Sequence, residues 1–131
     1  MARILVVDDD PDVRELMQII LESGGHRPTI VSTGPQALAA AQEEPFDVAL
    51  LDVRMEPMDG LEVATELHRG CPNLRIGMVT AADAPDSIAK AVAAKKQGVS
   101  RFLPKPLRRR EVLGFVDSLL AQEPGDGDSP S

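Results

Sequence analysis

Short apolar runs alternate along the chain with segments in which apolar residues recur every three or four positions. An apolar run without alternation, bounded by turn residues, is typical of a strand buried on both faces of a sheet. Repeated alternation of such strands with helices predicts an α/β fold built on a parallel sheet. We expect strands at Ile4–Val7, Thr29–Val31, Val48–Leu51, Ile76–Thr80 and Val99–Leu103.

Start and stop residues mark the helices that connect these strands. Asp10 followed by Pro11 suits an N-cap and the first helical position. Thr33 and Gln36 lie three residues apart, as in a capping box. A later segment begins at Pro85 and carries apolar residues at helical spacing. The pattern therefore predicts a helix after each strand.

Composition limits the kinds of protein this chain can be. With 131 residues, of which 43% are hydrophobic, we expect one domain with a real core. The net charge of −7 argues against direct binding to nucleic acid or to an anionic membrane. A single cysteine, Cys71, leaves no internal disulfide and fits a reducing cytoplasm. We expect a domain over residues 1–120 and a disordered tail or linker over 121–131.

Polar residues of unusual type follow four of the predicted strands. Asp8 and Asp9 follow the first, Asp52 ends the third, Thr80 ends the fourth and Lys105 follows the fifth. The carboxyl ends of parallel strands form one edge of a sheet, where ligands bind. We therefore expect these five residues to converge.

Three converging carboxylates predict a metal site. At 4 Å and an effective dielectric near 20, each close pair costs about 4 kcal/mol. Such a cluster is tolerated if it is solvated, partly protonated or bound to a divalent cation. Oxygen ligands alone indicate a hard ion, Mg²⁺ or Mn²⁺. A carboxylate beside such an ion and a lysine is suited to in-line phosphoryl transfer, in which the carboxylate attacks.

Four sequence blocks carry a family resemblance. The segments VVDDDPD, LLDVRMEPMDG, VTA and FLPKP resemble the signature blocks of the receiver domain of two-component response regulators. The resemblance extends over about residues 2–120, in the family's order. It implies a flavodoxin-like (βα)5 doubly wound fold with strand order 2-1-3-4-5.

The resemblance implies that Asp52 is the phosphoacceptor. Asp8 and Asp9 would be the acidic pair that binds Mg²⁺ or Mn²⁺ together with Asp52, and Asp9 would be the more direct ligand. The backbone carbonyl of Arg54 would complete the metal contacts.

It also implies residues that bind the phosphate and respond to it. Lys105, Thr80 and Ala81 would contact the phosphoryl group, and Lys105 would precede a cis peptide bond to Pro106. Thr80 and Phe102 would be the switch pair, in which Phe102 turns inward after Thr80 moves toward the phosphate.

The implied partners are a sensor histidine kinase or phosphotransfer protein and an unknown downstream effector. The effector would read the face formed by the helix expected from Pro85 (helix 4), the strand at Val99–Leu103 (strand 5) and the last helix, which carries Val112 to Leu119 (helix 5), with the chain as a monomer or a phosphorylation-dependent dimer. The implied activity is self-phosphorylation and self-dephosphorylation only.

Two departures from the family pattern are visible. Position 56 is Glu, and the usual proline is displaced to Pro57. The interval from Thr80 to Lys105 is also longer than usual, with the surplus between Ala81 and Gly98. We expect a modest effect on the loop and an altered partner surface.

Other interpretations of the same residues remain open. Asp8 and Asp10 form an Asp-x-Asp pattern that resembles haloacid-dehalogenase phosphatases, although the acidic pair expected after the lysine is missing. A flavin module of the same topology would need a phosphate loop where three aspartates stand. A receiver-like module that is never phosphorylated is a third alternative.

His26 and His68 are remote from every motif, and we expect both at the surface.

Overall fold

The computed structural model describes residues 2–52, 60–80 and 99–121. These residues form five strands and four helices. In chain order they are β1 (Arg3–Val7), α1 (Pro11–Ser23), β2 (Arg27–Val31), α2 (Gly34–Glu43), β3 (Val48–Asp52), α3 (Gly60–Gly70), β4 (Arg75–Thr80), β5 (Val99–Pro104) and α5 (Arg109–Leu120).

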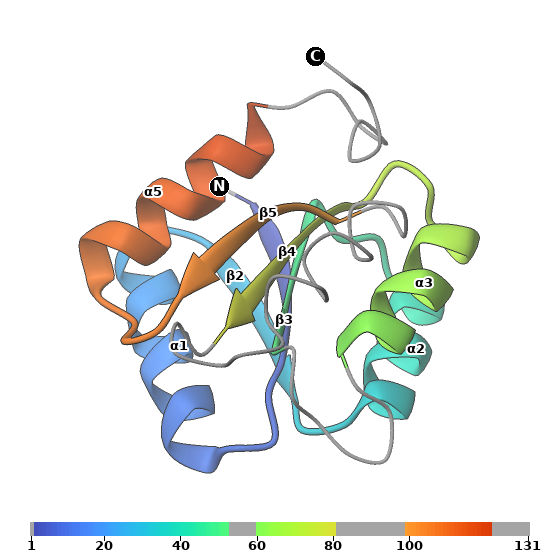
Figure 1. The fold of residues 1–131 in the computed structure, drawn as a ribbon, viewed down its shortest axis with the longest axis horizontal. Helices are drawn as coiled ribbons and strands as arrows, with labels where there is room; N and C mark the ends of the chain where they lie inside the picture. The colour runs from blue at the N-terminus through green and yellow to red at the C-terminus, as the bar shows by residue number, and fades with distance from the viewer. Residues whose placement is uncertain (1, 53–59, 81–98, 122–131) are drawn as a thin grey trace.

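The five strands form one parallel sheet in the order β2-β1-β3-β4-β5. The fold class and strand order predicted from the sequence are confirmed. The chain leaves β1 toward β2 on one side and returns through α2 to β3 on the other side (Figure 1). The order therefore reverses between β1 and β3, and a crevice is expected at their carboxyl ends.

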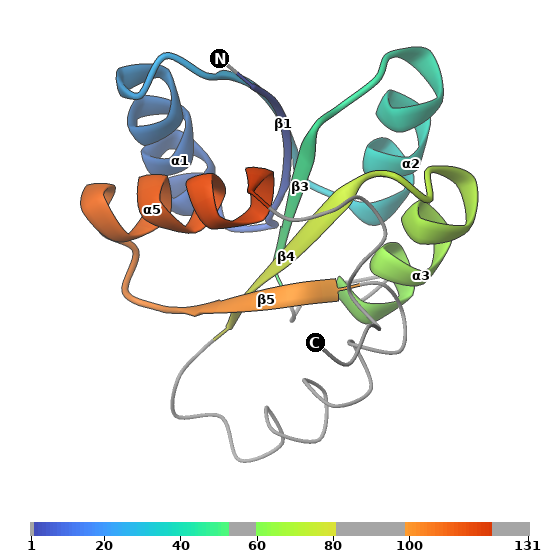
Figure 2. The ribbon, with the colours of Figure 1, turned by 90° about the horizontal axis from the view of Figure 1, so that it is seen from above.

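Helices cover both faces of the sheet. Helices α1 and α5 lie on one face, and α2 and α3 lie on the other (Figure 2). Successive residues of β3 alternate between the two layers: Ala49 and Leu51 belong to the core under α2 and α3, whereas Val48 and Leu50 belong to the core under α1 and α5. This two-sided burial explains why the strands are apolar without alternation.

The capping signals predicted for α1 and α2 are present. The Asp10 carboxylate accepts a hydrogen bond from the backbone N–H of Asp12 at 2.9 Å. At α2, Thr33 Oγ1 accepts from the N–H of Gln36, and Gln36 Oε1 accepts from the N–H of Thr33. Side chains thus fix where both helices begin.

Strand β2 is longer than predicted, because it begins at Arg27 and not at Thr29. Pro28 lies in the added part of the strand and cannot donate a hydrogen bond to the sheet. The sheet tolerates Pro28 because β2 is an edge strand, paired with β1 alone.

Some sequence predictions fall on residues outside the described ranges. They concern Arg54, the Glu56–Pro57 shift, Ala81, the helix expected from Pro85 and the tail after residue 121.

Candidate functional site

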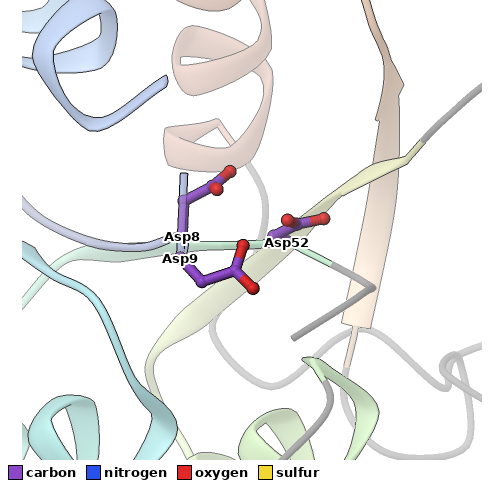
Figure 3. Close-up of side chains that lie close together, drawn as sticks. All are labelled: Asp8, Asp9 and Asp52. Atoms are coloured by element: carbon purple, nitrogen blue, oxygen red, sulfur yellow. The ribbon is translucent and has the colours of Figure 1, made fainter. Parts of the chain in front are cut away.

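Three aspartates gather at the carboxyl ends of β1 and β3. Asp8 and Asp9 directly follow β1, and Asp52 is the last residue of β3. Val7 pairs with Leu51 in register, so the residues that follow them, Asp8 and Asp52, lie side by side. One carboxylate oxygen from each aspartate lies within 4.8 Å of one from each of the others (Figure 3).

Two of these carboxylates are buried. Asp8 is 3% exposed and Asp52 is 7% exposed, whereas Asp9 lies at the surface. Burial raises the pKa of Asp8 because it disfavours the charged form. A hydrogen bond from the N–H of Asp10 to Asp8 Oδ1, at 2.9 Å, and the charge of Lys105 lower the pKa of Asp8, but burial outweighs them.

Lys105, which directly follows β5, supplies a positive charge on the other side of the site. Its Nζ lies 3.8 Å from Asp52 Oδ2 and 3.9 Å from Asp8 Oδ2. The side chain is 32% exposed, so the ammonium group spans the buried carboxylates and solvent. The expected cis peptide between Lys105 and Pro106 is present.

A bulge in β5 sets which way its residues face. Ile76 of β4 pairs with Val99, but Gly77 pairs with Arg101, so β5 contains one extra residue at Ser100. As a result Val99 and Phe102, three residues apart, both pack on the α2–α3 side, and Leu103 packs under α5. In a strand without a bulge, residues three positions apart would face opposite layers.

The two residues expected to form the switch lie on neighbouring strands. Phe102 is half-buried and pairs in register with Met78 of β4. Thr80 is the last residue of β4, and its backbone pairs with Pro104. Thr80 therefore stands two positions after Met78, at the same sheet edge as Asp52, which pairs with Val79.

The donor set fits a hard divalent cation. It consists of three carboxylates from two adjacent strands, and two of them are buried. No histidine or cysteine belongs to this group, and carboxylate oxygens are the ligands that Mg²⁺ prefers. Asp8, Asp9 and Asp52 are the described residues that would hold the ion.

Some contacts of the site were not predicted. Arg14 reaches back from α1, and its Nη1 donates to the carbonyl oxygen of Asp8 at 3.0 Å. His26 and His68, which were expected at the surface, are both half-buried. His26 Nδ1 accepts a hydrogen bond from the N–H of Ala2 at 3.2 Å and so joins the α1–β2 turn to the start of β1.

Sequence comparison identifies the family. The model of the response regulator receiver domain matches residues 4–117. The response regulator MprA of a Mycobacterium species is 37% identical over 132 residues, which is 99% of this chain and 56% of MprA. The transcriptional regulatory protein GlrR of Escherichia coli is 34% identical over 121 residues, which is 92% of this chain and 27% of GlrR.

Solved structures agree with this result. The chemotaxis protein CheY4 of Vibrio cholerae has a TM-score of 0.85 at 30% identity, with 92% of this chain and 99% of that chain covered. The response regulator TrrA of Thermotoga maritima, in complex with Mg²⁺ and BeF, has a TM-score of 0.79 at 31% identity, with 92% and 100% covered.

The parallel sheet in this order, with acidic residues and a lysine at its carboxyl edge, defines a two-component signalling domain. The chain belongs to the response regulator receiver domain family. It spans about a quarter of GlrR and about half of MprA. None of the helices in the described ranges has the length and apolar content that a membrane crossing requires.

Proposed function

We propose that the chain is a phosphoacceptor domain in which Asp52 receives a phosphoryl group from a sensor histidine kinase or a phosphotransfer protein. One observation carries the proposal. The Asp52 carboxylate lies within reach of the Asp8 and Asp9 carboxylates and 3.8 Å from Lys105 Nζ. This arrangement unites an attacking oxygen, oxygen ligands for a divalent ion and a cation for the phosphoryl oxygens.

Asp8 has a role distinct from that of Asp52. Its Oδ1 accepts a hydrogen bond from the N–H of Asp10, and its carboxylate lies within 4.8 Å of those of Asp9 and Asp52. We assign Asp8 the role of a metal ligand.

In the proposed reaction an Asp52 oxygen attacks phosphorus in line with the donor nitrogen. The new O–P bond forms as the P–N bond breaks, and the electron pair stays on the leaving imidazole. Lys105 Nζ donates to one phosphoryl oxygen, and the Thr80 hydroxyl and the Ala81 N–H are proposed to bind others. A bound Mg²⁺, held by Asp8, Asp9, Asp52 and the Arg54 carbonyl, would neutralise phosphoryl charge.

The proposed output is a shift between two conformations of the Phe102 side chain. Phosphorylation draws Thr80 toward the phosphate, and Phe102 then turns inward. An unidentified effector reads the helix 4–β5–α5 face, with the chain as a monomer or a phosphorylation-dependent dimer.

We further propose that the domain covers residues 1–120, that residues 121–131 are a linker or tail, and that the protein works in the cytoplasm.

Asp52→Asn tests the assignment, and Asp117→Asn, at an exposed position on α5, is its matched control. With acetyl phosphate and Mg²⁺, the wild type and Asp117→Asn are expected to take up one phosphoryl group per chain, and Asp52→Asn none. Equal labelling of Asp52→Asn would contradict the proposal.

The same assay separates the alternatives. Continuous turnover of a phosphomonoester, lost in Asp8→Asn, would indicate a haloacid-dehalogenase phosphatase. The capping role of Asp10 argues against that alternative, because the carboxylate that such an enzyme needs is bonded to the N–H of Asp12. Failure of the wild type to be labelled would favour the unphosphorylated module.

A further inference from the structure

The first residue of α3 lies against the main chain of the acceptor. Gly60 is buried, and a β-carbon built on it would lie 2.1 Å from the carbonyl oxygen of Asp52 and 2.9 Å from its carbonyl carbon. It would also lie 2.5 Å from Cε of Met78. Side chains do not approach backbone atoms this closely, so only glycine allows α3 to pack here.

The two obstacles differ in how easily they move. Met78 Cε is the end of a flexible side chain and can turn aside. The Asp52 carbonyl belongs to the backbone of β3, and displacing it displaces the Cα that carries the acceptor carboxylate. The carboxylate stands 3.8 Å from Lys105 Nζ, so a shift of this backbone alters the geometry of the site.

We propose that Gly60 is a positioning residue for Asp52: its missing side chain lets the first turn of α3 close on the Asp52 main chain, which holds the acceptor carboxylate in line with Lys105 and the other two aspartates. This proposal rests on Asp52 being the phosphoacceptor. A residue in this position acts on the rate of phosphoryl transfer, since a displacement near 1 Å at a reacting group lowers a rate about 100-fold.

The test measures labelling of the purified chain by acetyl phosphate with Mg²⁺. Gly60→Ala is expected to lower the maximal rate about 10- to 100-fold and to shift the NMR resonances of Asp52 in the absence of Mg²⁺. Gly70→Ala is the matched control, because it changes the same helix at a position with nothing within 4 Å. It is expected to leave the rate and those resonances unchanged.

Val63→Ala separates positioning from stability. It removes buried methyl groups from α3, so it lowers the free energy of unfolding without placing an atom near Asp52. Its labelling rate is expected to match the wild type. Sucrose keeps Gly60→Ala folded during the assay if that variant is strongly destabilised.

A double variant identifies the obstacle that matters. Gly60→Ala with Met78→Ala removes the contact at Met78 Cε but keeps the collision with the Asp52 carbonyl, so labelling is expected to stay slow. Full recovery in the double variant would overturn the proposal, as would a normal rate in Gly60→Ala alone. If the wild type itself were not labelled, the failure would lie with the proposed function.

Discussion

The ammonium group of Lys105 lies 3.8 Å from a carboxylate oxygen of Asp52, although 53 positions separate the two residues. The contact joins β5 to β3 across β4, which lies between them in the sheet. The same nitrogen lies 3.9 Å from Asp8. Lys105 thus offsets part of the repulsion between buried carboxylates while remaining open to an incoming anion.

Replacing Lys105 by Gln is expected to slow labelling of Asp52 by about 100-fold, because a preorganised charge on the transferring group is lost. The rate is measured with acetyl phosphate at saturating Mg²⁺. Arg108→Gln is the control, since Arg108 is an exposed cation just before α5. Equal loss in both variants would mean that overall charge matters and not this contact.

The stability of the metal-free protein should depend on pH through Asp8. Burial raises the pKa of Asp8 above 3.8, so the folded state retains a proton that the unfolded chain gives up. The contribution of Asp8 to stability is therefore greatest below pH 3.8 and is lost as pH rises through the raised pKa. Asparagine at position 8 does not ionise, so in Asp8→Asn this fall in stability with rising pH is absent. In urea titrations with a chelator, the advantage of Asp8→Asn over the wild type should grow with pH and then level off above the raised pKa.

Removal of Mg²⁺ should destabilise the wild type and leave Asp8→Asn little changed. A ligand at 100 times its dissociation constant adds about 2.7 kcal/mol to the free energy of unfolding. Far-ultraviolet circular dichroism is the suitable probe, because the chain contains no Trp and no Tyr. An equal gain from Mg²⁺ in Asp8→Asn would exclude Asp8 from the metal site.

Gly77 controls how closely α5 packs on the sheet. A β-carbon there would lie 2.6 and 2.7 Å from ring carbons of Phe115 and 2.9 Å from Leu119. Gly77→Ala is expected to lower the free energy of unfolding by about 1–3 kcal/mol. Phe115→Leu should restore part of the loss in the double variant, as measured in urea.

Gly114→Ala is the control for this pair, because a β-carbon at Gly114 would meet nothing within 4 Å. It is expected to stabilise α5 by about 0.5–1 kcal/mol, since alanine is the better helix former. If Phe115→Leu recovered none of the free energy of unfolding that Gly77→Ala loses, the strain would not lie at the contact with the Phe115 ring.

The sequence was sufficient to predict the sheet and the clustering of four residues of the candidate site. Apolar runs without alternation predicted the strands. Because the carboxyl ends of parallel strands form one edge of a sheet, the residues after those strands were predicted to cluster, as Asp8, Asp9, Asp52 and Lys105 do. Both steps need only the local pattern of apolar residues and the right-handedness of strand–helix–strand connections, which holds for nearly all proteins.

Other features depend on three-dimensional packing that no local pattern reports. The hydrogen bond between His26 and Ala2 crosses 24 positions, so nothing near His26 signals it. The approach of Gly60 to the Asp52 carbonyl depends on the angle at which α3 meets the sheet. The bulge at Ser100 depends on how β5 pairs with β4.

That bulge bears on how the family pattern tolerates changes in chain length. From Gly77 to Thr80, each residue of β4 pairs with a successive residue of β5, ending at Thr80 with Pro104. The hydrogen-bonding lattice, and not the length of the intervening chain, therefore sets the distance from Thr80 to Lys105. Residues inserted before Val99 are expected to leave this pairing intact. Removal of Ser100 would give a regular strand in which Val99 and Phe102, then two positions apart, still face the same layer. We therefore expect changes of chain length to be tolerated before β5 and at its bulge, whereas a residue removed between Arg101 and Pro104 would shift Lys105 relative to Thr80.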